Sequence, residues 1–281
     1  MRSSGFGVFI TICFLVCNNI GHAESAGSIT PEHGKVNTAD PSTVDPGHYE
    51  IELNYGYLRA TRAFNSNSDS VERGSLDERE TSLVLTAGLI ENWDMYFGLL
   101  FVRITDDETD PNRGSGIGDV EFGGRYRFIN NETAGLEVAY TAGFVAPTGS
   151  DGNEDEIGTS QQYWSLEQAV ILSKDWGQWT MNAELGYSLP FGEDSEDSDG
   201  GVTLNAAVGY QITPAIQPEL ELNYGKEFVA IDDDADVLSV TAGLVMPLSD
   251  SFLMKAGVVK DVSGTNADKA TLYLINLKLA F

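Results

Sequence analysis

The sequence predicts an all-β protein, an antiparallel transmembrane β-barrel of about twelve strands. Three observations support this fold class. Stretches of alternating polarity recur along the chain, with apolar side chains on one face and charges of both signs on the other. Long and short connections alternate between these stretches. No apolar run after the N-terminus reaches the about 18 residues that a membrane helix needs.

The clearest of these stretches is Gly116 to Phe128. Read with a period of two, it has one face of apolar, aromatic or small residues and one charged face. The first face is Val120, Phe122, Gly124, Tyr126 and Phe128, and the second includes Asp119, Glu121, Arg125 and Arg127. Lipid on one side and a wet lumen on the other explain such a strand.

The N-terminus has the features of a secretory signal. Arg2 precedes an apolar run, and Gly21-His22-Ala23 offers small residues before a cut. We therefore expect three parts: a signal peptide at residues 1–23, a flexible periplasmic segment at 24–47 that is poor in apolar residues, and a barrel at 48–281. Both cysteines, Cys13 and Cys17, lie in the signal, so no disulfide is expected in the mature chain.

The mature chain is strongly acidic. Removing Arg2 from the 16 basic residues leaves 15 against 43 acidic residues, a formal net charge of −28. This charge disfavours binding to nucleic acid. The short acidic blocks at residues 106–110, 154–156, 193–199 and 232–236 all fall in the longer connections, which we expect to face the cell exterior.

The alternation places each strand in turn, from the first after the N-terminal segment to the last at the C-terminus. The predicted strands are residues 49–58, 80–90, 94–104, 118–128, 134–146, 160–173, 179–189, 202–213, 216–228, 237–248, 252–261 and 269–281. Polar segments at 61–79, 105–115, 147–159, 190–201, 229–236 and 262–268 are the predicted long loops, and the remaining connections are short turns. An even strand number with both termini on one side is the bacterial outer-membrane arrangement, so we expect the outer membrane of a Gram-negative cell.

The last strand alternates up to a terminal aromatic residue. Tyr273, Leu279 and Phe281 lie on its outward face, and nothing follows Phe281. This pattern resembles the C-terminal signal that the barrel-assembly machinery reads in its substrates.

The inward charges are the candidate lumen lining. They are Glu50, Glu52, Asp119, Glu121, Arg125, Arg127, Glu137, Glu167, Glu184, Glu219, Glu221, Lys255 and Lys278. Charges inside a barrel must be paired or hydrated. Two interpretations stay open: a salt-bridge network that fills the lumen, or a polar path for a small solute. We expect Arg125 and Arg127 to face Glu137 on the next strand as a charged ladder.

Histidine-based catalysis has little support in this sequence. The three histidines are His22, His33 and His48, none of which lies beyond the start of the first strand. Barrel enzymes such as outer-membrane phospholipases use a histidine as base or proton carrier. We therefore expect no catalytic residues and no cofactor, and a mechanism that uses inward carboxylates alone is the enzymatic alternative.

One acidic block, residues 193–200, has the oxygen ligands that calcium prefers. Asp194, Asp197 and Asp199 are its candidate ligands, although the block lacks the distal glutamate of an EF-hand. A solvated acidic loop is the simpler interpretation, with divalent cations bridging to lipopolysaccharide phosphates as the alternative.

The Gly116 to Phe128 stretch, together with Ala146-Pro147-Thr148-Gly149-Ser150 and Leu185-Gly186-Tyr187, resembles an outer-membrane family named for the meta pathway of phenol degradation. The resemblance implies a barrel transporter for small, aromatic or hydrophobic compounds, and it brings no catalytic residues. The partners expected are outer-membrane lipid, lipopolysaccharide, the assembly machinery and a small solute. A surface barrel without conductance, adhesin-like or ligand-holding, is the alternative function.

Overall fold

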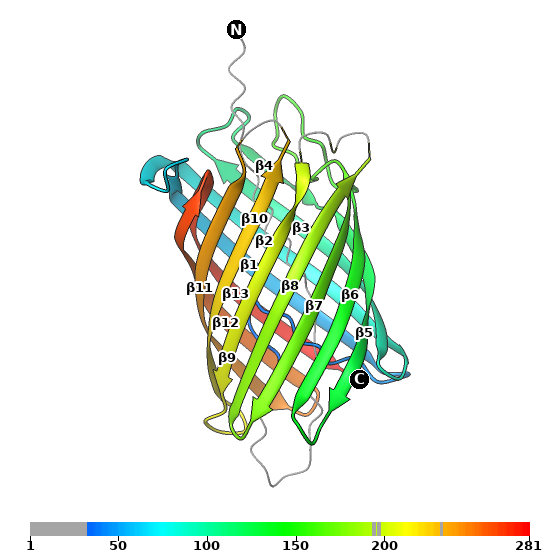
Figure 1. The fold of residues 1–281 in the computed structure, drawn as a ribbon. Helices are drawn as coiled ribbons and strands as arrows, with labels where there is room; N and C mark the ends of the chain where they lie inside the picture. The colour runs from blue at the N-terminus through cyan, green and yellow to red at the C-terminus, as the bar shows by residue number, and fades with distance from the viewer. Residues whose placement is uncertain (1–32, 193–194, 196–197, 231–232) are drawn as a thin grey trace.

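The computed structural model describes residues 33–281 except 193–194, 196–197 and 231–232. Thirteen strands make up its regular structure, and Figure 1 shows them tilted around a single lumen. Their bounds are β1 Tyr49–Phe64, β2 Ser70–Ile90, β3 Trp93–Asp106, β4 Arg113–Ile117, β5 Val120–Asn131, β6 Leu136–Ala146, β7 Trp164–Trp176, β8 Trp179–Phe191, β9 Ser198–Tyr210, β10 Gln217–Val229, β11 Ala235–Ser249, β12 Phe252–Thr265 and β13 Ala267–Ala280.

Twelve of these strands form a closed antiparallel wall, which confirms the predicted fold. Each pairs with its neighbours in chain order, β3 pairs with β5, and β1 pairs with β13 to close the ring. The backbones of Tyr49 and Phe281 exchange two hydrogen bonds at 2.8 and 3.0 Å, and their rings stack. The C-terminal residue therefore completes the closure.

The thirteenth strand, β4, is an addition that the sequence did not predict. β3 pairs with β5 from Trp93 to Gly98 and with β4 from Phe101 to Thr105. The segment that follows β6 covers the other edge of β4, where the Ile157 N–H donates to the Arg113 carbonyl at 2.8 Å. Five residues with two glycines give too short an alternation to be recognised.

Two of the predicted long loops are instead continuations of the strands. Residues 61–79 form the upper parts of β1 and β2, with residues 65–69 as the turn, and residues 262–268 continue β12 into β13 around Asn266. Both stretches are polar on each face because they extend beyond the apolar band, and polarity alone does not distinguish a strand in water from a loop.

Along the strands of the wall, the apolar side chains on the outward face are exposed and the polar side chains on the inward face are buried, which is the reverse of a soluble protein. Outward apolar side chains such as Leu85, Phe97 and Ile275 are exposed, whereas inward Glu52 and Thr241 are buried. Aromatic residues lie at both ends of strands, as in β7, which begins at Trp164 and ends at Trp176. This is the surface of a barrel that spans a membrane. Among the described residues, no helix is long and apolar enough to cross one.

The two rims of the barrel differ. Short turns join β2 to β3, β5 to β6, β7 to β8, β9 to β10 and β11 to β12 at one rim, called here the turn end. The other connections, including the longest at residues 147–163, lie at the opposite rim, called here the loop end, at the top of Figure 1. The predicted rhythm of short and long connections is confirmed only in part, because the connections from β1 to β2 and from β12 to β13 at the loop end are short as well.

Candidate functional site

The lower part of the lumen is occupied by the chain itself. Residues 33–47, the segment just before β1, lie inside the ring of strands, and this stretch is called here the inner segment. Lys35, Thr38, Asp40 and Val44 are at most 2% exposed. Residues 33–47 of the predicted flexible segment are therefore bound inside the barrel. The composition of this segment indicates that it has no hydrophobic core of its own, but it does not indicate that the barrel wall can bind its backbone.

Carboxylates on β10 hold the apex of the inner segment. Glu219 Oε1 accepts the Val36 N–H at 2.6 Å. Glu221 accepts the N–H groups of Asn37 at 2.9 Å and Thr38 at 2.7 Å, and also the Thr38 hydroxyl at 2.5 Å. Three consecutive main-chain N–H groups thus find carboxylate acceptors on one strand, so an extended backbone without secondary structure is held here.

A second set of contacts comes from β8. Asn182 Nδ2 donates to the carbonyl oxygens of His33 at 3.0 Å and Ala39 at 2.9 Å. Glu184 Oε2 accepts the Ala39 N–H at 3.0 Å and the Asn205 side-chain amide at 3.1 Å. We call Asn182, Glu184, Glu219 and Glu221 the clamp, because each binds main-chain atoms of the inner segment.

The returning part of the inner segment contacts β3 and β5. The Val44 N–H donates to Asp94 Oδ2 at 3.0 Å, and the same oxygen lies 2.5 Å from Arg125 Nη2. Arg125 Nη1 donates in turn to the Asp40 carbonyl at 3.2 Å. Asp94 and Arg125 are both almost fully buried, so each compensates the charge of the other.

Side-chain packing also fits the inner segment to the wall. Gly243 on β11 and Gly257 on β12 are directly paired, and a Cβ atom on either would lie 2.6 or 2.8 Å from a methyl group of Val36. Such contacts are shorter than van der Waals distance. The two glycines therefore form the seat of Val36.

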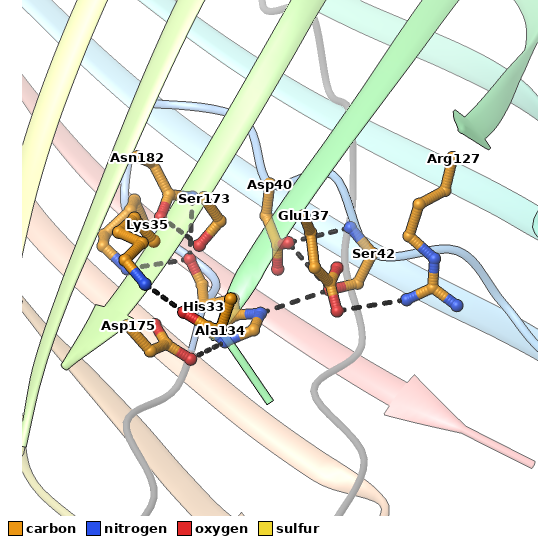
Figure 2. Close-up of polar contacts among 11 residues, drawn as sticks. His33, Lys35, Asp40, Ser42, Arg127, Ala134, Glu137, Ser173, Asp175 and Asn182 are labelled. Carbon is orange, nitrogen blue, oxygen red and sulfur yellow. Dashed lines mark hydrogen bonds and ion pairs between the residues drawn. The ribbon is translucent and has the colours of Figure 1, made fainter. Parts of the chain in front are cut away.

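His33 anchors the other arm of the inner segment, as Figure 2 shows. Its Nε2 contacts Asp175 at the end of β7, and its Nδ1 lies 3.4 Å from Ser42 Oγ. Burial is the largest single influence and opposes protonation of His33, but the hydrogen bond to Asp175 and the nearby negative charges together outweigh it, and the pKa rises from 6.5 to about 9. The negative charges of Asp40 and Glu137 act in the same direction. His33 is therefore a cation at neutral pH.

His33, Asp40 and Glu137 offer donor atoms within 4.8 Å of one another, a spacing that a metal ion could use. These donors already have protein partners. Ser42 Oγ contacts Asp40 Oδ1 at 2.9 Å and Glu137 Oε2 at 3.1 Å, and Arg127 pairs with Glu137 Oε1 at 3.2 Å. The arrangement is that of a hydrogen-bonded ion cluster (Figure 2).

The predicted charged ladder is half present. Arg127 pairs with Glu137 as expected, whereas Arg125 pairs with Asp94 on β3. The register places Arg125 opposite Thr141, four residues along β6 from Glu137, whereas Arg127 lies opposite Ala139 and closer to Glu137. Alternation assigns a face to each side chain but does not set the register.

The remaining predicted lumen residues on the strands face inward. Asp119 differs, because it lies between β4 and β5 and its carboxylate accepts the N–H groups of Thr148, Gly149 and Gln161. Lys278 Nζ lies 3.9 Å from Glu50 Oε1, the side-chain amide of Asn276 contacts Glu52, and Lys255 is buried opposite Asn276 in the register. The larger set divides into buried and half-buried members. Buried are Arg125, Arg127, Glu167, Glu184, Glu219, Glu221, Lys255 and Lys278, and half-buried are Glu121 and Glu137.

Above the inner segment the lumen opens into a cavity of about 570 Å³, called here the upper cavity. Asn37 belongs to its floor, and Glu167 and Glu184 belong to its wall. Glu167 accepts the Ser165 hydroxyl at 2.9 Å. No histidine is among the described residues that line this cavity, so its chemistry is that of carboxylates, amides and apolar side chains.

The other predicted sites lie outside the lumen. Tyr273, Leu279 and Phe281 are exposed on the outward face, where an assembly factor or lipid would meet them, and their role as a signal stays a prediction. Asp199 is exposed in β9. Asp194 and Asp197 lie outside the described residues, so the predicted calcium loop stays a prediction.

Sequence reasoning missed Asp94 and Asn182 as functional residues. Asp94 directly follows the turn at Asn92-Trp93, and Asn182 comes shortly after the turn at Gln178-Trp179. The alternation places both in predicted strands but gives neither of them a role. Their inward parity in the alternation was the available signal, because a polar residue on the lumen face has to bind something.

The fold has counterparts among solved structures. The COG4313 outer membrane channel from Pseudomonas putida F1 has a TM-score of 0.77 and 16% identity, and the match covers 88% of this chain and all of that one. The beta domain of the Bordetella autotransporter Brka has a TM-score of 0.52 and 13% identity, covering 84% of this chain and all of that domain. At these identities the likeness shows the fold, which is that of Gram-negative outer-membrane barrels.

No curated protein matches this chain. The sequence does match the family described as "Putative MetA-pathway of phenol degradation" over residues 36–276. The matched range includes most of the inner segment and nearly all of the barrel wall, and it confirms the resemblance that the sequence motifs indicated. Because it covers most of the chain, the protein belongs to this family.

Proposed function

We propose that the protein is a narrow outer-membrane channel that passes small solutes, among them aromatic or hydrophobic compounds, through its upper cavity. The observation that carries this proposal is a charged lumen with a cavity of about 570 Å³ above and, below it, the inner segment in place of a folded domain. Side-chain hydrogen bonds hold this segment, whereas continuous main-chain ladders hold each strand on both sides, so the segment and not the wall is the part that can move. The inner segment is thus the gate of the proposed channel.

The solute class follows from the lining. Leu58, Leu76, Ile104 and Leu272 give the upper cavity an apolar side, which suits the compounds suggested by the family name. A solute must still pass the clamp carboxylates at the floor. The path therefore favours small neutral or cationic molecules over anions.

Planar-bilayer recording tests this function. The full-length mature protein is expected to show a small conductance that prefers cations, and a variant lacking residues 33–44 is expected to conduct several-fold more. Heat-modifiable gel mobility checks that both barrels assemble. Current in neither protein, with normal assembly, would contradict the channel and favour the surface barrel without conductance.

A further inference from the structure

The upper cavity has two unlike sides. One is an apolar wall made by the inward faces of β1, β2, β3, β12 and β13 and by the segment that follows β6. Its main members are Leu58, Leu76, Ile104, Ile157, Val259 and Leu272, which belong to two packed apolar clusters that share Leu58. A channel that passes only ions has no need of such a surface, because apolar side chains that face water make no favourable contact with it.

The rest of the lining is acidic. Nine carboxylate residues face two basic residues, Arg73 and Lys226. The acidic residues are Glu78, Asp106, Glu108, Glu167, Glu184, Glu227, Asp236, Asp261 and Asp268. With all of these ionised, the lining has a formal charge of −7. Walls of low dielectric constant focus such a field on the interior.

Neither basic residue offers a free positive charge to a solute. Arg73 is paired with Asp106 at 2.6 Å, with Glu108 at 3.5 Å and with Asp268. Lys226 Nζ pairs with Asp234 Oδ2 at 2.9 Å. The two basic side chains of the upper cavity are therefore already paired with carboxylates and are not available to bind an anion.

Several carboxylates, in contrast, form no ion pair within the described part of the chain. Among them Glu78 is placed within the apolar wall, because β2 pairs it with Leu58 on one side and with Ile104 on the other. Leu76 is the preceding inward residue of β2. Glu80, the next inward residue of β2, is its carboxylate neighbour and interacts with it through a side-chain hydrogen bond. A carboxylate in this setting is costly unless a proton shared with that neighbour, water or a cation compensates its charge.

These observations point to one ligand chemistry. We propose that the upper cavity binds small organic cations, amines or quaternary ammonium compounds with an apolar body, whose charged group sits by Glu78 while the body lies on the apolar wall. The inference rests on the proposed function only in taking the upper cavity to be reached by solutes. The volume suits a molecule of the size that pockets of a few hundred cubic ångströms enclose.

A matched set of probes tests the proposal. The intact protein in lipid nanodiscs is titrated calorimetrically with 4-phenylbutylamine, 4-phenylbutanol and 4-phenylbutyrate, which share one apolar body. We expect the amine to bind about tenfold more tightly than the alcohol, a difference of about 1.4 kcal/mol, and the carboxylate to bind most weakly. Equal affinities for the amine and the alcohol, or no binding of any probe, would overturn the proposal.

Two substitutions separate the contributions of charge and apolar surface. Glu78→Gln is expected to reduce amine affinity toward that of the alcohol and to leave alcohol binding unchanged. Leu272→Ser is expected to weaken both probes. Glu91→Gln, at an exposed turn far from the upper cavity, is the control and should change neither. A Glu78→Gln protein that assembles and still prefers the amine would place the cation elsewhere and refute the assignment to Glu78.

Bilayer current, recorded on the same preparations, separates this inference from the channel function. A conducting protein without amine preference would retain the channel and remove the organic-cation site. Amine binding without current would retain the site and remove the channel.

Discussion

The lower and upper parts of the lumen are built from the same residue type but use it differently. Below, Glu184, Glu219 and Glu221 accept hydrogen bonds from the backbone of the inner segment. Above, Glu78 and Glu167 receive no bond from that segment and face open space. An inward glutamate therefore holds the inner segment where a main-chain N–H of that segment reaches it, and it is open to a solute where none does.

Glu221→Gln should have the largest effect on this difference. Both oxygens of Glu221 accept N–H groups, so an amide would turn its NH₂ toward a donor and leave one main-chain group unsatisfied. The loss should be about 1–3 kcal/mol of binding to the inner segment. We expect single-channel conductance to rise several-fold, or long openings to appear, in bilayer recordings.

The control for this variant is Glu91→Gln, which removes the same charge at the turn end without touching the inner segment. If both variants conduct alike, charge near the mouth and not the clamp would set the current. This result would contradict the claim that the lower glutamates control the current by holding the inner segment.

Arg125→Leu and Arg127→Leu test how deeply the lower network is buried. Arg125 and Asp94 are at most 3% exposed, so removing Arg125 leaves a buried, uncompensated carboxylate, at a cost of about 3–5 kcal/mol. Arg127 and Glu137 are more accessible and should tolerate the change better. Thermal unfolding should show a clearly lower midpoint for Arg125→Leu, and equal midpoints would contradict the assigned pairing.

Much of this architecture could be predicted from the sequence. The alternation around Glu121 to Arg127 predicts a strand of a barrel wall, and the same alternation predicts that Glu219 and Glu221 face inward. Both predictions follow because a membrane barrel imposes a period of two on every strand. The inner segment could not be predicted. Its residues, such as Thr38 and Asp40, have no periodicity, and their partners on the wall lie 183 and 85 positions away in the sequence.

The pH dependence of the lower lumen should follow His33. In the bound segment its pKa is about 9 against an ordinary 6.5, with Asp175, Asp40 and Glu137 as the facing acids. A raised pKa means that protonation favours the bound state, so this contribution is complete below pH 6.5 and is lost as the pH rises through 9. At about 1.4 kcal/mol per pKa unit, the loss is at most ~3.5 kcal/mol.

Bilayer recordings between pH 6 and pH 10 measure this effect. Conductance or open probability should increase toward the alkaline end, and His33→Gln should remove the part of that increase that is centred between 6.5 and 9. An unchanged pH profile in His33→Gln would show that His33 does not hold the inner segment. No histidine is among the described residues that line the upper cavity, so a change that His33→Gln removes belongs to the lower lumen.

The smallest expected effect separates two neighbouring carboxylates. Glu167 on β7 and Glu184 on β8 are both buried and both line the upper cavity, but only Glu184 also binds the inner segment, through the Ala39 N–H. Glu167→Gln removes one of the nine acidic charges and should lower cation selectivity slightly, seen as a small shift of reversal potential in a salt gradient, at unchanged conductance. Glu184→Gln should cause the same shift and, in addition, more frequent openings, because one bond to the inner segment is weakened. If Glu167→Gln also altered the openings, the upper carboxylates would be coupled to the gate, and the division of the lumen into a clamped and an open part would no longer hold.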